Sequence, residues 1–176
     1  MADARLLQQL DFISELDQLK LILRRISLIG ESRLENSAEH SWHLGVMASV
    51  LAEYAVEGTD IGRATRMLLI HDVVEIDAGD TFCFDAQANL DKEEREVRAA
   101  DRLFGMLPGE QGSELRELWD EFESGDTPTA RYANALDRLQ GLLMNCGNEG
   151  GTWNEYGVSM EQILERMDPI LSLIHI

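Results

Sequence analysis

The segment Leu68-Leu-Ile-His71-Asp72-Val-Val-Glu75-Ile-Asp-Ala-Gly79-Asp80 joins an apolar helical stretch to an adjacent histidine and aspartate. Apolar side chains recur at helical spacing upstream of it, which predicts a helix from Asp60 to about Glu75 with His71 on its buried face. Gly79 and Asp80 end this helical pattern. An imidazole nitrogen together with a carboxylate oxygen suits Zn, Mn, Fe, Co or Ni and, with water ligands, Mg. His71 and Asp72 are therefore candidate ligands of a divalent ion.

Two further residues could complete a ligand set with His71 and Asp72. His40 lies at the head of an apolar helical stripe, one turn before Leu44. Asp137 lies inside an apolar helix, where aspartate is unfavourable unless it has a specific role. Each residue alone is more often a hydrogen-bonded core residue than a ligand. The order His, His-Asp, Asp, with every member on a predicted helix, supports a metal site better than any one residue does.

The rest of the chain also shows helical spacing of apolar residues and little strand-like alternation. Its length of 176 residues fits one domain, and only three prolines interrupt the pattern. We therefore predict an all-α, single-domain bundle of six or seven helices over residues 1–176, with the metal site inside about 15–145. The expected helices cover residues 4–27, 37–54, 60–75, 91 to the Pro108-Gly109 break, a segment around 115–122, 128–146 and about 158–174.

The charge balance restricts the possible partners. The formal net charge is -18, from 33 acidic and 15 basic residues. A protein that binds DNA or RNA polymers needs a basic face to displace counterions, and an anionic membrane surface also attracts basic segments. Both kinds of partner are therefore disfavoured. A small phosphorylated substrate remains compatible, because a cation and one or two arginines can neutralise it locally.

The two cysteines and the termini bear on location. Cys83 and Cys146 form no metal-type or redox-type pair, and the chain has neither a secretory leader nor an apolar run of transmembrane length. We therefore expect a reduced, cytoplasmic protein. The apolar tail from Leu171 to Ile176 either packs as a helix end or is foreign to the native chain.

These residues resemble the signature of the HD-domain superfamily of metal-dependent phosphohydrolases, which reads His, His-Asp, Asp along the chain. The branch that contains the 5'-deoxynucleotidases is more similar still. Its Glu-Asn-x-x-Glu-His-Ser pattern matches Glu35 to Ser41, and its His-Asp-x-x-Glu-x-x-x-Gly-Asp pattern matches residues 71–80. The resemblance covers roughly residues 15–145, which is most of the chain.

The resemblance implies a role for each matched residue. His40, His71, Asp72 and Asp137 would hold one divalent ion, which polarises a phosphoryl group and activates a water. Glu75 would orient that water or act as its base, and Asp80 would position the water or protonate the leaving 5'-oxygen. Arg25 aligns with an arginine near the substrate phosphate. The implied reaction is release of phosphate from a nucleoside 5'-monophosphate, and family members often form homodimers.

Two positions depart from the branch. Bacterial members tend to have a tryptophan directly after the arginine that aligns with Arg25, and this chain has Ile26. That tryptophan is associated with discrimination against a ribose 2'-hydroxyl, so the resemblance does not fix a preference for deoxynucleotides. A proline commonly follows the Gly-Asp pair, where this chain has Thr81-Phe82.

Two other classes of metalloprotein require motifs that this sequence lacks. A di-iron bundle would need Glu-x-x-His pairs and a zinc protease would need His-Glu-x-x-His, and the sequence contains neither. The guanosine tetraphosphate hydrolases of the same superfamily tend to carry Glu-Asp together after the His-Asp pair, whereas here Ile76 separates Glu75 from Asp77. Two alternatives remain. The protein could hydrolyse another phosphorylated nucleotide such as guanosine tetraphosphate, or it could be a non-catalytic HD module that binds a metal or a nucleotide. A set of two histidines and two aspartates does not specify the metal.

Overall fold

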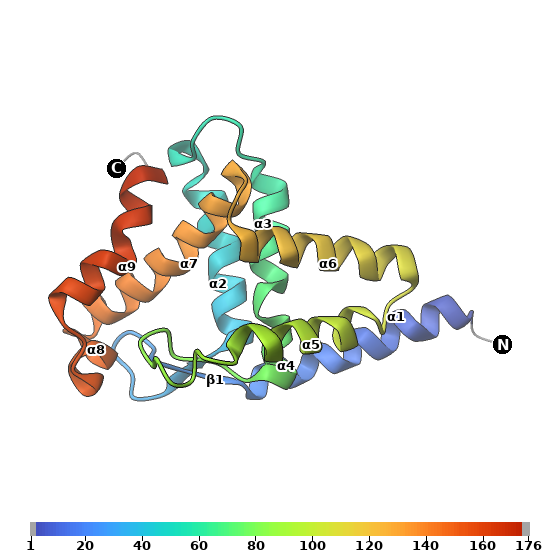
Figure 1. The fold of residues 1–176 in the computed structure, drawn as a ribbon, viewed down its shortest axis with the longest axis horizontal. Coiled ribbons are helices and arrows are strands. Elements are labelled where there is room, and N and C mark those ends of the chain that lie inside the picture. The colour runs from blue at the N-terminus through green and yellow to red at the C-terminus, as the bar shows by residue number, and fades with distance from the viewer. Residues whose placement is uncertain (1–2, 174–176) are drawn as a thin grey trace.

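A computed structural model describes residues 3–173 of the protein, and it confirms the predicted all-α class. Three helices pack together at the centre, namely α2 (Ser37–Val50), α3 (Ile61–Ile70) and α7 (Pro128–Gly147) (Figure 1). The pair α5 (Lys92–Phe104) and α6 (Gly109–Ser124) lies on one side, and α9 (Met160–Leu173) packs along α7 on the other. The remaining elements are α1 (Ala4–Glu15), α4 (Glu75–Ala78), α8 (Gly151–Tyr156), the 3₁₀ turns η1 (Leu16–Leu21), η2 (Ala52–Tyr54) and η3 (His71–Val74), and the strands β1 (Leu23–Ser27) and β2 (Leu34–Asn36).

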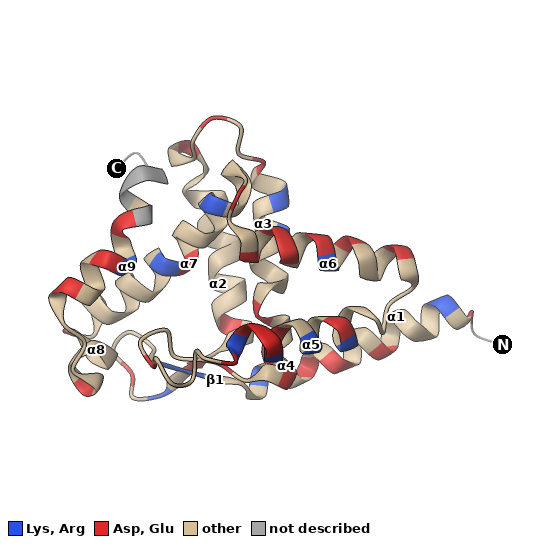
Figure 2. Ribbon diagram, in the orientation of Figure 1, with Lys and Arg blue, Asp and Glu red and all other residues tan. Residues whose placement is uncertain are grey.

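The core consists of two clusters of buried apolar side chains. The first joins α2, α3, α6, α7 and α9, and the second joins α1, η1, η3, α5 and α6. Ile70 and Leu115 pack against both clusters, so the two are continuous. Within residues 3–173, none of the helices is long and apolar enough to cross a membrane. Acidic side chains are spread along α5, α6 and α9, as expected for a well-solvated surface (Figure 2).

The predicted helix over residues 4–27 is wrong beyond residue 15. The α1 helix ends at Glu15, η1 follows, and residues 23–27 form β1, which pairs antiparallel with β2. Of the leucines after residue 15, Leu19 is buried, whereas Leu21 and Leu23 are 71% and 56% exposed. The backbone groups of β1 find their partners in β2, and the strand packs against α7 and α8. Tertiary pairing therefore overrides the local helical pattern here.

The α2 helix begins where its capping signal predicts. Asn36 is the N-cap, its side chain accepts a hydrogen bond from the Glu39 backbone N–H, and the Glu39 carboxylate accepts one from the Asn36 N–H. The helix ends at Val50, earlier than the predicted end near residue 54, and η2 continues the segment. Because the start of α2 is fixed in this way, His40 lies on the first turn with its side chain fully buried.

The predicted helix over residues 60–75 is continuous only to Ile70. The chain then tightens into η3 and resumes as α4. Gly79 follows with φ of 75°, a conformation that favours glycine, and turns the chain into the loop that begins at Asp80. The prediction for residues 128–146 agrees with α7 within one residue. The short α8 was not predicted, and residues 174–176 of the apolar tail lie outside the described part of the chain.

Candidate metal centre

The four residues predicted to bind a metal converge from three elements. His40 comes from α2, His71 and Asp72 from η3, and Asp137 from α7. His40 Nε2 lies 3.0 Å from Asp137 Oδ1 and 3.8 Å from Asp72 Oδ2, and His71 Nε2 lies 3.0 Å from Asp72 Oδ1. One potential ligand atom from each of His40, His71 and Asp72 lies within 4.8 Å of the other two. All three of these residues are buried, and the Asp137 side chain is 21% exposed.

The two histidine rings are held so that one nitrogen of each faces the carboxylates. His71 Nδ1 donates to the Leu68 carbonyl oxygen at 2.9 Å, so Nε2 carries a lone pair in the neutral ring. His71 Nε2 is buried and has no hydrogen-bond partner among the described residues. His40 Nδ1 faces Glu35 Oε2 at 3.5 Å, which directs Nε2 toward Asp137. Histidine ligands of metals are usually oriented through the other ring nitrogen in this way, so these residues fit a divalent cation.

The carboxylates change the protonation of their neighbours. Burial alone would lower the pKa of His71, but the Asp72 carboxylate beside it raises that pKa to about 9. Burial would likewise raise the pKa of Asp137, but the hydrogen bond with His40 and the nearby positive charges hold it well below its usual range. The site therefore offers negatively charged oxygens together with a histidine that carries a proton near neutral pH.

This protonation predicts a pH-dependent affinity for metal. His71 must lose its proton before Nε2 can bind a cation, so affinity for Mn²⁺ should rise as the pH rises toward about 9. Titration calorimetry in buffers of different ionisation enthalpy should detect protons released on binding. An affinity that stays constant between about pH 6 and 9, with no proton release, would contradict this expectation.

Arg24 is a member of the site that the sequence analysis missed. Its Nη1 donates to Asp72 Oδ2 at 2.8 Å and lies 3.9 Å from Asp80 Oδ1, and its Nη2 lies 4.0 Å from Asp137 Oδ1. Burial alone would lower the pKa of Arg24, but the surrounding carboxylates raise it, so the guanidinium stays charged. The helical spacing predicts a helix over residues 23–27, but the strand that forms there places the neighbouring Arg24 and Arg25 on opposite faces.

Removal of the Arg24 charge should destabilise the protein. Arg24→Ala leaves the buried Asp72 carboxylate without its nearest cation, and breaking such a pair costs about 3 kcal/mol. Chemical denaturation without added metal should show this loss of unfolding free energy. Arg25→Ala is the matched control. Arg25 is the next residue in the chain, its side chain is exposed, and it pairs with none of these carboxylates within the described residues. Equal effects of the two substitutions would contradict the role of Arg24.

Glu75 and Asp80 both lie beside the candidate ligands. Glu75 is buried at the start of α4 and accepts a hydrogen bond from the Ser37 hydroxyl at 2.5 Å. Burial, together with the negative charge of Asp72, raises the pKa of Glu75 well above its usual value. Burial also raises the pKa of Asp80, against the opposing effect of Arg24. Perturbed carboxyl groups of this kind are suited to proton transfer.

Arg25, the residue predicted to contact a phosphate, lies at the edge of the site. It is exposed, its guanidinium carbon lies 5.6 Å from the centre of the Tyr156 ring, and Nη1 lies 3.4 Å from the Tyr156 hydroxyl. The adjacent Ile26 also faces the cavity described next. The role of Arg25 stays a prediction.

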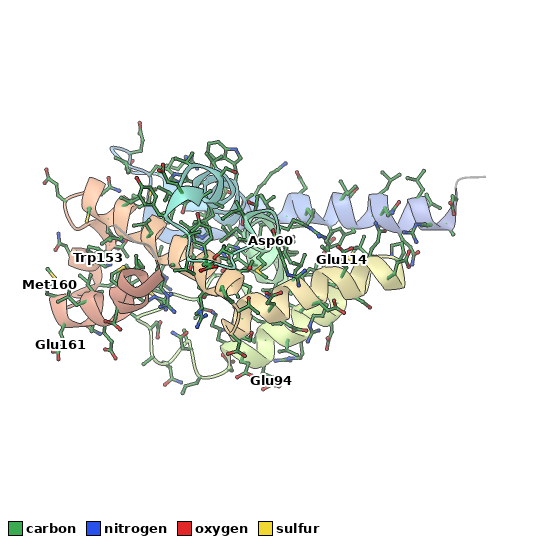
Figure 3. The ribbon with its side chains drawn as sticks, turned by 90° about the horizontal axis from the view of Figure 1, so that it is seen from above. Asp60, Glu94, Glu114, Trp153, Met160 and Glu161 are labelled. Atoms are coloured by element: carbon green, nitrogen blue, oxygen red, sulfur yellow. The ribbon has the colours of Figure 1, made fainter. Side chains whose placement is uncertain are left out.

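A cavity of about 350 Å³ opens beside these residues. Its walls come from β1, η3, α4 and the loop after it, α5, α6, α7, α8 and α9. One part of the wall is aromatic, with Phe82 packed 5.5 Å from Phe84 between ring centres. Trp153, at the α8–α9 end of the molecule in Figure 3, also lines it. The remaining lining includes His71, Asp72, Glu75, Asp80, Asp137, Arg24, Arg25, Lys92, Glu96, Glu123, Arg138 and Arg166.

Comparison with known proteins defines the class of this chain. The model of the HD domain family matches residues 16–174. The chain belongs to the HD domain family. A crystal structure named "Predicted metal-dependent phosphohydrolase", from Magnetospirillum magnetotacticum, superposes with a TM-score of 0.93 at 53% sequence identity, covering 97% of this chain and 86% of that one.

Curated relatives are similar over part of their length. The 5'-deoxynucleotidase HDDC2 of Homo sapiens is 30% identical over 111 residues, which cover 63% of this chain and 53% of the relative. The 5'-deoxynucleotidase of Erwinia tasmaniensis is 31% identical over 135 residues, covering 71% of this chain and 68% of the relative. The chain thus spans about half the length of the human relative.

Proposed function

We propose that this protein is a metal-dependent phosphohydrolase that releases phosphate from nucleoside 5'-monophosphates, as a 5'-deoxynucleotidase does. The observation that carries the proposal is the convergence of His40, His71, Asp72 and Asp137 beside one cavity. These four residues would hold one divalent ion. The names of the similar proteins support the same activity.

A divalent ion held by His40, His71, Asp72 and Asp137 would polarise the phosphoryl group and lower the pKa of a bound water. The remaining chemistry falls to the side chains of the protein. The water oxygen forms a bond to phosphorus, the bond from phosphorus to the 5'-oxygen breaks, and the products are a nucleoside and inorganic phosphate. Glu75 takes the proton of the attacking water, and its raised pKa makes its carboxylate a stronger base than an ordinary glutamate. The Ser37 hydroxyl keeps the carboxyl group in place.

Asp80 would supply the proton for the leaving 5'-oxygen. Its pKa is raised by burial, which favours the protonated acid that such a donor must be. Arg24 lies between Asp80 and Asp72 and holds both carboxyl groups at the cavity wall. Arg25 would contact the substrate from the edge of the cavity, where it is exposed. The protein thus separates a base and an acid on adjacent segments, α4 and the loop after it.

Phosphate release from a panel of substrates tests the proposal. The panel contains deoxy- and ribonucleoside 5'-monophosphates and guanosine tetraphosphate, each with Mn²⁺, Co²⁺, Ni²⁺, Fe²⁺, Zn²⁺ or Mg²⁺. We expect monophosphates to be hydrolysed, with Asp72→Ala inactive. Release no greater than that of Asp72→Ala with every metal would overturn the enzyme assignment. Nucleotide binding without turnover would favour a non-catalytic module, and a preference for guanosine tetraphosphate would favour the other hydrolase branch.

Three further features belong to the same proposal. Residues 1–176 form one HD domain, which the continuity of the two core clusters supports. The protein works in the cytoplasm, consistent with Cys83 and Cys146 both being free. It acts as a homodimer, for which the exposed apolar side chains of α1 provide a contact surface, namely Leu6, Leu7, Leu10 and Ile13. Light scattering on the purified protein measures the oligomeric state directly.

A further inference from the structure

Two arginines line the cavity on the side formed by α7 and α9. Arg138 follows the candidate ligand Asp137 on α7, and Arg166 projects from α9, which packs along α7 (Figure 1). Both side chains are half-buried. The two arginines therefore face the same cavity as the candidate metal ligands, from a different wall than Arg24 and Arg25 on β1.

Arg138 and Arg166 differ from most other arginines of the protein in lacking an acidic partner. Arg63, Arg102 and Arg116, for example, form ion pairs with nearby carboxylates. Between residues 3 and 173, neither Arg138 nor Arg166 forms an ion pair or a side-chain hydrogen bond. In a chain with a formal charge of -18, carboxylates are abundant. Two unpaired guanidinium groups in one cavity wall therefore indicate a place for an external anion.

The two positive charges line one wall of the cavity, because α9 packs along α7. Placing like charges together in a partly buried wall is unfavourable unless an anion joins them. A phosphate group suits this arrangement, because a guanidinium group donates parallel hydrogen bonds to its oxygens.

The charge at the metal ligands makes additional cations necessary. Asp72 and Asp137 together balance the charge of one divalent ion, and Arg24 is already engaged by Asp72. A phosphate dianion that approaches this site also meets the neighbouring Glu75 and Asp80. Arg25 contacts Tyr156 at the edge of the cavity. Lys92, another cation of the cavity wall, is paired with Glu96. Arg138 and Arg166, together with the more exposed Arg25, are thus the positive charges left to balance the dianion.

We propose that Arg138 and Arg166 together bind the phosphate group of the substrate from the α7–α9 side of the cavity. This inference rests on the proposed function, because it assigns two substrate-binding residues to the same site. The pair holds the oxygens that the ion does not, and it retains inorganic phosphate after the nucleoside has left. Substrates that carry a phosphate dianion are therefore favoured over uncharged esters.

Binding of inorganic phosphate to the metal-loaded protein tests the pair without requiring turnover. Titration calorimetry should show that Arg166→Gln and Arg138→Gln each weaken phosphate binding by about tenfold or more, with Arg166→Lys less affected. Arg131→Gln is the matched control, because Arg131 is an exposed arginine on the same helix α7. Metal content must be measured alongside, since Arg138 adjoins Asp137. Arg166 lies on a separate helix and provides the independent test.

The results separate this inference from the proposed function. An Arg166→Gln protein with full metal content and unchanged phosphate affinity would overturn the proposal that the two arginines bind phosphate. A wild-type protein that binds no phosphate would overturn it as well. Steady-state kinetics should show a raised KM for the nucleotide and a smaller change in kcat. Arginine-dependent phosphate binding without hydrolysis of any nucleotide would support the pair and remove only the enzymatic assignment.

Discussion

Asp72→Asn should reduce phosphate release by about a thousandfold or more, because a metal ion supplies several kcal/mol of transition-state stabilisation and each 1.36 kcal/mol is tenfold in rate. Asp72 is the residue on which the site depends most, since it contacts His71 and Arg24 and faces His40. The asparagine keeps the volume of the side chain but removes its charge. Metal content of the purified variant and its initial rates of phosphate release measure the effect.

Asp77→Asn is the control for this substitution. Asp77 lies five residues further along, on α4, where it is exposed and pairs with Arg102. It should keep full metal content and activity, because an exposed ion pair contributes little. Thermal unfolding of both variants separates loss of the metal from loss of the fold. An Asp72→Asn protein that binds metal and hydrolyses nucleotides normally would refute the ligand assignment.

Glu75→Gln should lower kcat by about a hundredfold to ten-thousandfold, the usual contribution of general acid–base catalysis, while metal content stays unchanged. The glutamine can still accept the Ser37 hydrogen bond, but it cannot take a proton from water. In the wild-type protein, activity should rise with pH as Glu75 loses its proton, through a pKa above the usual glutamate value. In the Glu75→Gln variant, this rise of kcat with pH should disappear.

Glu94→Gln provides the same chemical change at a residue that does not line the cavity. Glu94, labelled in Figure 3, is exposed on α5 and pairs with Arg98. Its substitution should leave kcat and the pH profile as in the wild type. If Glu75→Gln kept both the wild-type kcat and the wild-type pH profile, the proton would have to move by a route other than Glu75.

The sequence predicted the candidate ligands because helical periodicity is a local property. His40 and Asp137 lie on α2 and α7, which formed close to the predicted positions, and His71 lies just after the end of α3, in η3, where the predicted helix is interrupted. The strand β1 could not be found in this way, because its stability comes from pairing with β2, a separate segment further along the chain, with Leu23 opposite Asn36 and Ser27 opposite Leu34. Arg24 was missed for the same reason, since only the strand turns it toward Asp72.

The α9 wall of the cavity was also beyond the sequence pattern. A last helix was predicted, but its position against α7 depends on packing between side chains far apart in the chain. The juxtaposition of Arg138 and Arg166 follows from that packing. The family resemblance pointed to Arg25, whereas the three-dimensional arrangement adds one arginine at the carboxylates and two on the α7–α9 side of the cavity.

The ligand set also affects how long the folded chain persists. His40 and Asp137 stand 97 residues apart in sequence and meet at 3.0 Å. An ion held by both, with His71 and Asp72 between them, would divide the chain into two closed loops, as a covalent crosslink does. Global unfolding would then require the ion to depart first. The rate of metal dissociation would accordingly limit the rate of unfolding. A chelator would then shorten the lifetime of the native protein without any substitution in the chain.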